Sequence, residues 1–192
     1  MTRIIAGVAK GRRLGVPKDA TRPTADAVRE SIFSSLTARW SELDDVNVLD
    51  LFAGTGAFGL EALSRGAAAA VFVESDRQVV RQLHANVEAV GLPGAQVVGR
   101  TVQAVLAAAP PPAAPFDLVF ADPPYADALE VLPTVRIALS TPGWLADDAL
   151  VILEHASRQR LPGSWPSGFE PWPVRSYGQT AVEPARWYGP AS

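Results

Sequence analysis

The chain of 192 residues contains no cysteine, only two histidines, and no apolar run of the roughly 20 residues that a membrane-spanning helix requires. Without cysteine there are no disulfides, thiolate metal sites or cysteine nucleophiles. His84 and His155 are far apart in the sequence and do not complete a usual metal-ligand set, so we expect no metal. The N-terminus also lacks the apolar core of a signal peptide. We therefore expect a soluble cytoplasmic protein that has no membrane partner.

The charge is unevenly distributed along the chain. Residues 1–40 contain eight basic and three acidic residues, whereas the remainder contains nine basic and seventeen acidic ones. A basic arm on an acidic body is typical of polyanion binding, although a solvated charged face gives the same count. With 48% hydrophobic residues, the chain is long enough for one globular domain with a small extension.

The N-terminal residues predict a basic hairpin followed by a helix. Residues 3–8 and 12–16 are short extended candidates, with Arg12 and Arg13 near the turn between them. Thr24 is a candidate N-cap for a helix whose apolar residues recur at helical spacing. We interpret residues 1–42 as a basic N-terminal extension made of this hairpin and helix, and residues 43–192 as the main domain.

From Val46 onward, strands and helices alternate. Apolar strand candidates lie at 46–52, 69–75, 95–99, 116–122 and 149–155, with helical patterns between them, and an antiparallel pair is expected within 173–189. Buried strands joined by helices are typical of a parallel sheet covered on both faces. The sequence predicts a doubly wound α/β fold with a mostly parallel, seven-stranded sheet.

A G-x-G-x-x-G pattern, at Gly54, Gly56 and Gly59, follows the first of these strands. In a dinucleotide-binding turn the next helix holds a pyrophosphate, which Asp50 at the end of the strand would repel. S-adenosylmethionine has no phosphate and carries an ammonium and a sulfonium, both of which a carboxylate attracts. Gly54 and Gly56 would let the backbone approach its amino-acid part, and Gly59 is expected to serve helix–strand packing.

Other polar residues are expected at the same edge of the sheet, where ligands bind in open parallel sheets. Glu74 ends the second strand, twenty residues after Gly54, where a carboxylate can accept both ribose hydroxyls of a nucleoside cofactor. Asp76 is better explained as a helix cap. The contact with adenine is expected near Thr101 and Val102, where no acidic residue is present.

The stretch "DPPY", residues 122–125, ends the fourth predicted strand. Pro123 has no N–H, so the Asp122 carboxylate and the Pro123 carbonyl are acceptors without a competing donor. Such a pair suits the exocyclic NH2 of a base, held so that it faces the sulfonium methyl. Tyr125 offers a flat face for a base that has left its helix. No separate general base is evident, and Asp122 or water can take the proton.

The stretches "VLDLFAGTGAFGLEAL" and "DPPY" resemble class I S-adenosylmethionine-dependent amino-methyltransferases. The stretches "RIIAGVAKGRRL", "RPTADAVRESIFSSL" and "YGQTAV" are similar to the bacterial family that methylates N2 of a guanine, at position 966, of 16S ribosomal RNA. This resemblance covers nearly the whole chain, and it implies that residues 1–42 dock on RNA and that residues 43–192 form the S-adenosylmethionine-dependent methyltransferase domain. It implies 16S ribosomal RNA, within an assembling 30S particle, as the partner of a monomeric enzyme, with S-adenosylhomocysteine as the product.

The resemblance also implies a set of site residues. The cofactor would contact Asp50, Phe52, Ala53, Gly54, Gly56, Glu74, Ser75, Thr101 and Val102; the guanine amine would contact Asp122, Pro123 and Tyr125; RNA would contact Arg3, Lys10, Arg12, Arg13, Arg22, Thr24 and Pro124.

Three alternatives stay open at this point. A DNA adenine-N6 or protein-glutamine methyltransferase would share the glycine loop and a closely similar proline motif. The chain has no extra module for reading DNA sequence, and relatives that act on amides usually have Asn at the position of Asp122. A nicotinamide oxidoreductase is disfavoured by Asp50 and "DPPY". A non-catalytic RNA-binding protein with a relic cofactor fold has no need of an intact "DPPY".

Overall fold

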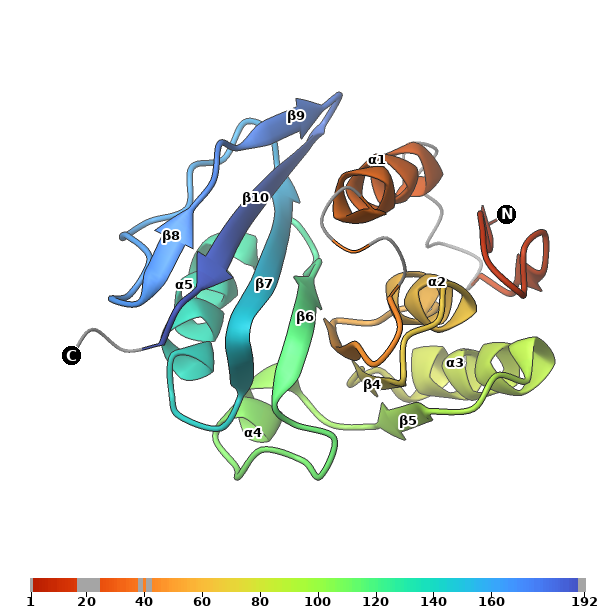
Figure 1. Cartoon of the computed structure of the whole chain (residues 1–192). Helices are drawn as coiled ribbons and strands as arrows, with labels where there is room; N and C mark the ends of the chain where they lie inside the picture. Colours follow the sequence, from red (N-terminus) through yellow and green to blue (C-terminus); the bar gives the residue numbers. More distant parts are fainter. Residues whose placement is uncertain (1, 17–24, 38–39, 41–42, 190–192) are drawn as a thin grey trace.

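The computed structural model describes residues 2–16, 25–37, 40 and 43–189 (Figure 1). Strands form at β1 (Thr2–Arg3), β2 (Arg13–Leu14), β3 (Asn47–Leu51), β4 (Ala69–Val73), β5 (Ala95–Val98), β6 (Phe116–Ala121), β7 (Leu145–Ala156), β8 (Phe169–Pro171), β9 (Arg175–Tyr177) and β10 (Thr180–Trp187). Helices form at α1 (Ala25–Thr37), α2 (Ala57–Ser64), α3 (Arg77–Val90), α4 (Val102–Leu106) and α5 (Ala128–Leu139). The predicted residues Arg22 and Thr24 lie outside the described residues.

The main sheet has the order β5-β4-β3-β6-β7-β10-β8, and β9 also pairs with β10. Strands β3 to β7 run parallel to one another, and β10 is antiparallel to β7, β8 and β9. The predicted doubly wound α/β fold is confirmed. The sheet has eight strands rather than seven, because β8 and β9 share the edge of the long strand β10.

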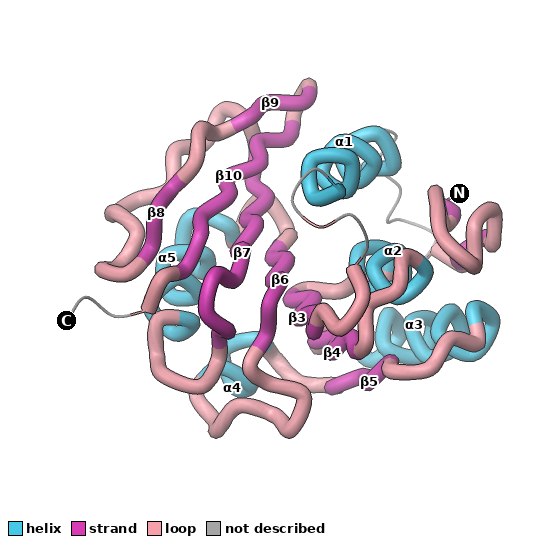
Figure 2. The backbone as a smooth tube through the Cα atoms, in the orientation of Figure 1, coloured by secondary structure: helices cyan, strands magenta, loops and turns pink. Residues whose placement is uncertain are grey.

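Helices cover both faces of this sheet (Figures 1 and 2). On one face Phe72 and Phe120 pack with α1, α2 and α3, while on the other Val71 and Val119 pack with α4 and α5. This division follows from the alternation of side chains along buried strands. Helix α1 belongs to the first core: the ring of its Phe33 lies 5.7 Å from that of Phe120.

Several local predictions are confirmed. The Asp76 carboxylate caps α3 by accepting the backbone N–H groups of Gln78 and Val79, and α3 ends at Gly91, where φ is 61°. A Cβ at Gly59 would lie 2.3 Å from the Phe72 ring, so a side chain there would not fit between α2 and β4.

The N-terminal hairpin differs from its prediction. Strands of about five residues were expected at 3–8 and 12–16, but β1 and β2 have two residues each. The backbone N–H groups of Ile5 and Ala6 donate to the Glu61 carboxylate on α2 instead of extending the hairpin. Within the described ranges, no helix is long and apolar enough to cross a membrane.

Candidate active site

The parallel strands end in register at one edge of the sheet. Leu51 pairs with both Val73 and Ala121, Val73 also pairs with Val98, and Ala121 with Leu153. The residues that follow these strands are therefore brought side by side, as expected for a ligand-binding edge.

A cavity of about 1080 Å³ opens at this edge. The residues predicted for the site that line it are Asp50, Phe52, Ala53, Gly54, Glu74, Ser75, Thr101, Val102, Asp122 and Pro124. Three other predicted residues, Gly56, Pro123 and Tyr125, are not among the residues that line the cavity. The volume is at the upper end of small-molecule pockets, which leaves room for a cofactor and part of a substrate.

Asp50 is a buried acid at the end of β3, only 3% exposed. Its Oδ2 accepts the backbone N–H of Gly59 at 2.9 Å, which ties β3 to α2. The pKa of Asp50 is raised to about 8, chiefly by burial and also by the nearby carboxylates of Asp122 and Glu74, although the Gly59 hydrogen bond lowers it. Without a ligand, Asp50 therefore keeps its proton at neutral pH.

Three residues of the glycine loop have backbone φ angles in the left-handed region. Gly54 and Gly56 have φ angles of 54° and 78°, and Phe52 has a φ of 60°, in the left-handed region that costs energy for a residue with a side chain. The N–H of Gly54 donates to the Glu74 carboxylate at 3.1 Å. Glu74, predicted to bind a ribose, thus lies directly against the loop predicted to bind the amino-acid part.

Residues 122–125 follow β6. Asp122 is half-buried and lines the cavity, while Pro123 is buried. The Tyr125 hydroxyl lies 2.6 Å from that of Thr180, and Gln159 Nε2 donates to the Tyr125 carbonyl at 2.8 Å. Strand β10 and the segment after β7 therefore fix the position of Tyr125. Thr180 itself lines the cavity, a contribution that the sequence did not indicate.

The predicted adenine region lies at the start of α4. The Thr101 hydroxyl caps this helix by accepting the N–H of Ala104 at 3.2 Å, and Val102 is 3% exposed. Gln103 lines the cavity beside them and adds a neutral amide. The residues of this segment that line the cavity, Thr101, Val102 and Gln103, are all uncharged.

The cavity is strongly acidic. Of the described residues that line it, eight carry carboxyl groups and a single one, Arg29, is basic. The carboxyl groups belong to Asp26, Asp50, Glu74, Asp76, Asp122, Asp127, Glu130 and Glu154. Glu154 lies near the end of β7 and was not predicted as a site residue. Such a surface attracts cations and disfavours phosphates.

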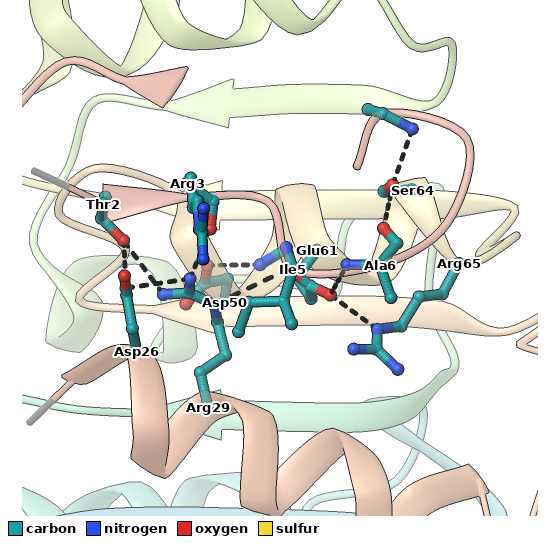
Figure 3. Close-up of polar contacts among 12 residues, drawn as sticks. Thr2, Arg3, Ile5, Ala6, Asp26, Arg29, Asp50, Glu61, Ser64 and Arg65 are labelled. Carbon is teal, nitrogen blue, oxygen red and sulfur yellow. Dashed lines mark hydrogen bonds and ion pairs between the residues drawn. The ribbon is translucent and has the colours of Figure 1, made fainter. Parts of the chain in front are cut away.

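Arg29 extends from α1 into the wall of this cavity (Figure 3). Its guanidinium donates to the Arg3 carbonyl at 2.7 Å and to Asp26 at 3.0 Å, and its Nε lies 3.8 Å from a Glu61 oxygen. Arg29 is only 2% exposed, so this charge of the basic arm is not available to a polyanion.

Glu61 anchors the hairpin to α2 (Figure 3). It is fully buried and accepts the N–H groups of Ile5 and Ala6 at 2.7 and 3.0 Å and the Arg65 Nε at 2.7 Å. Ser64 adds a second anchor, because its carbonyl accepts the N–H of Val8 at 2.7 Å. The hairpin is therefore part of the site's framework.

Four basic residues predicted to contact RNA belong to this hairpin. Arg3, Lys10, Arg12 and Arg13 are all exposed. Arg12 has an additional function, since its Nη1 donates to the carbonyls of Ala89 and Val90 at the end of α3. Substitution of Lys10 or Arg13 therefore tests a predicted phosphate contact without also removing the Arg12 contact to α3.

The two histidines lie apart from the cavity. His84 is exposed on α3, whereas His155 is buried and its Nε2 lies 3.7 Å from a Glu183 oxygen. Glu183 also accepts the Trp165 Nε1 at 2.8 Å and contacts Arg136, so His155 belongs to a buried polar cluster beneath the sheet. Among the described residues, no group of three or more potential metal ligands comes together.

Comparison with known proteins gives one family and close relatives. The family model described as Conserved hypothetical protein 95 matches residues 2–185. The chain is 42% identical to Ribosomal RNA small subunit methyltransferase D of Escherichia coli, over 83% of this chain and 77% of the relative. It is 34% identical to the protein of the same name in Haemophilus influenzae, over 85% and 84% of the two chains. A solved Escherichia coli structure named "Putative methyltransferase yhhF" superposes with a TM-score of 0.84 at 36% identity, over 97% of both chains.

Proposed function

This chain belongs to the Conserved hypothetical protein 95 family, and on that premise we propose that it transfers a methyl group from S-adenosylmethionine to the exocyclic N2 amine of a guanine in 16S ribosomal RNA. By family resemblance the guanine is the one at position 966. The single observation that carries the proposal is the acidic cavity, in which Asp50, Glu74 and Asp122 stand at the ends of three adjacent strands.

The residues present fit S-adenosylmethionine. Its ammonium and sulfonium suit a cavity whose described lining contains eight carboxyl groups, whereas a dinucleotide would bring phosphates to the same acids. In this proposal Gly54 lets the loop approach the amino-acid part without a side chain, Glu74 accepts the ribose hydroxyls, and Thr101 and Val102 contact the adenine; all four line the cavity, whereas Gly56 is buried against Leu83 and Phe72. When bound, the cofactor supplies an electrophilic methyl group.

The target amine is assigned to Asp122 and the Pro123 carbonyl. Two acceptors hold the two N–H groups of an exocyclic amine and direct its lone pair along the line of transfer. The amine becomes acidic as it gains the methyl, so Asp122 or water can take its proton without a dedicated base. Tyr125, fixed by Thr180, is the proposed stacking surface for the guanine.

We assign RNA binding to the exposed basic residues of the N-terminal hairpin. Lys10, Arg12 and Arg13 are exposed there, while the acidic cavity disfavours phosphates, so the backbone stays outside and the base alone enters. The proposed substrate is 16S ribosomal RNA in an assembling 30S particle in the cytoplasm, acted on by a monomer.

Mass mapping of 16S ribosomal RNA from cells with and without the gene tests this proposal. We expect loss of one methyl from a guanine, restored by the wild-type gene and by Asp147→Ala, an exposed acid outside the cavity. Asp122→Ala should fail to restore the methyl although the protein still binds S-adenosylmethionine. A methyl lost from another base, or turnover by Asp122→Ala, would refute the assignment.

A further inference from the structure

Asn86 on α3 joins two parts of the molecule that the proposed function keeps separate. Its side chain is 3% exposed and makes four hydrogen bonds. Its Oδ1 accepts the backbone N–H of Gly15 at 2.8 Å and Gln82 Nε2 at 3.2 Å; its Nδ2 donates to the carbonyls of Gly15 at 3.0 Å and Thr55 at 2.9 Å. One carboxamide thus holds both the N-terminal arm and the glycine loop.

Both partners of Asn86 lie next to functional groups. Thr55 stands between the glycines of the cofactor loop and lines the cavity. Gly15 follows directly after β2, two residues beyond the exposed Arg13, and the next residue, Val16, lines the cavity. A displacement of the hairpin on RNA therefore acts on Asn86 through two backbone hydrogen bonds.

The arm is closely fitted to α3 at this point. A Cβ at Gly15 would lie 2.1 Å from Gln82 Nε2 and 3.2 Å from Asn86 Oδ1. A second contact, from Arg12 to the last carbonyls of α3, ties the same segment to the same helix. The arm and α3 are therefore joined by several contacts, and Asn86 connects them to the cofactor loop through its hydrogen bond to the Thr55 carbonyl.

We propose that Asn86 is a positioning residue that links RNA binding at the N-terminal hairpin to cofactor binding at the glycine loop. RNA bound to the hairpin holds Gly15 in the position described here, and Asn86 in turn holds the Thr55 carbonyl, so RNA raises the affinity for the cofactor. By thermodynamic reciprocity, the cofactor raises the affinity for RNA by the same factor. This inference rests on the proposed function, because it assigns RNA to the hairpin.

The test measures binding of S-adenosylhomocysteine, which cannot react, by equilibrium dialysis with and without 16S ribosomal RNA. In the wild-type protein, RNA should raise the affinity by about fivefold or more, the usual range of such coupling. Asn86→Asp keeps the shape and an acceptor but loses the amide donors to Gly15 and Thr55. Its affinity should be nearly the same with and without RNA.

Gln82→Ala is the matched control, because it removes the neighbouring donor and leaves both bonds of Nδ2 in place. It should retain the wild-type ratio of affinities. A merely structural Asn86 would lower the melting temperature of Asn86→Asp but leave that ratio unchanged, and this result would overturn the proposal.

A measurement on the wild-type protein covers the case in which Asn86→Asp does not fold. RNA should slow hydrogen exchange of the amides at 53–57 by about fivefold or more, as well as that of the hairpin. Protection confined to the hairpin would overturn the proposal. If RNA neither binds nor accepts a methyl, the proposed function fails; if both occur but the two ligands bind independently, the linkage alone fails.

Discussion

Replacement of Asp50 by Asn should change how the stability of the protein depends on pH. Asp50 is buried, accepts the Gly59 N–H, and its pKa is raised from 3.8 to about 8, chiefly by burial. Between these two pH values the folded protein keeps the proton that the unfolded chain has lost. The contribution of Asp50 to stability is therefore complete below pH 3.8 and is lost as the pH rises toward 8.

The magnitude follows from the linkage relation. One proton held by the folded state and absent from the unfolded state lowers the free energy of unfolding by about 1.4 kcal/mol per pH unit. From pH 5.5 to 7.5 the loss due to Asp50 is about 3 kcal/mol. Asn at position 50 does not ionise, so the free energy of unfolding of Asp50→Asn lacks this contribution to its pH dependence. Its amide oxygen can still accept the Gly59 N–H.

Urea unfolding followed by tryptophan fluorescence at the two pH values gives the difference between wild type and variant. That difference should move by about 3 kcal/mol in favour of Asp50→Asn, while contributions from other groups cancel. A difference that stays constant would show that Asp50 is already ionised in the folded protein, and would refute the burial argument.

The same change should remove part of the pH dependence of cofactor binding. A cationic ligand favours the ionised form of Asp50, so the wild-type affinity for S-adenosylmethionine should rise by up to about tenfold per pH unit below pH 8, with release of a proton. Calorimetry in buffers of different ionisation enthalpy measures that proton. The variant should release none from this position.

Three further changes test other parts of the site. Glu74→Ala should weaken S-adenosylmethionine binding by about tenfold, since it removes the proposed ribose acceptor and the partner of the Gly54 N–H; an unchanged dissociation constant would show that Glu74 does not bind the ribose. Neutralising Lys10 and Arg13 together should lower RNA affinity and reduce the slope of log K against log salt by roughly two, and equal slopes would argue against the arm. Glu61→Ala should destabilise the protein by about 3 kcal/mol or more in urea unfolding, because two arginines and two backbone N–H groups lose a buried partner; its exposed counterpart Glu30→Ala should change stability by less than about 0.5 kcal/mol.

The order of the elements from Asn47 onward could be predicted because its signals are local. Near-continuous Val, Leu and Phe runs give the parallel strands, and Asp76 and Gly91 bound α3 by capping rules that act within a few residues. The edge of the sheet followed from topology alone, since parallel strands with helical crossovers end on the same side.

The roles of Arg29, Glu61 and Asn86 in holding the N-terminal arm were not predicted, because the arm residues that they contact lie far away in the sequence. Glu61 contacts Ile5, 56 residues before it, and Asn86 contacts Gly15 at a separation of 71. One signal was available for Glu61: α2 reads "AFGLEALS", a helix that is apolar on nearly every side. Such a helix is expected to be buried, and a carboxylate in it requires partners. No comparable signal distinguishes Arg29 from the other basic residues of the arm.

The close contact between Gly7 and α2 limits how easily the N-terminal hairpin could be transferred to another enzyme. A Cβ at Gly7 would lie 1.7 Å from the Ser64 carbonyl oxygen, and the hairpin backbone depends on Glu61 and Asn86 for its hydrogen bonds. A chimera that carries residues 1–42 on another methyltransferase domain would retain the basic side chains but lose the hydrogen bonds that hold the hairpin to α2 and α3. To transfer the hairpin, the recipient helices would have to receive these acceptors as well, so the proposed RNA-binding segment can be moved only together with the faces of α2 and α3 that hold it.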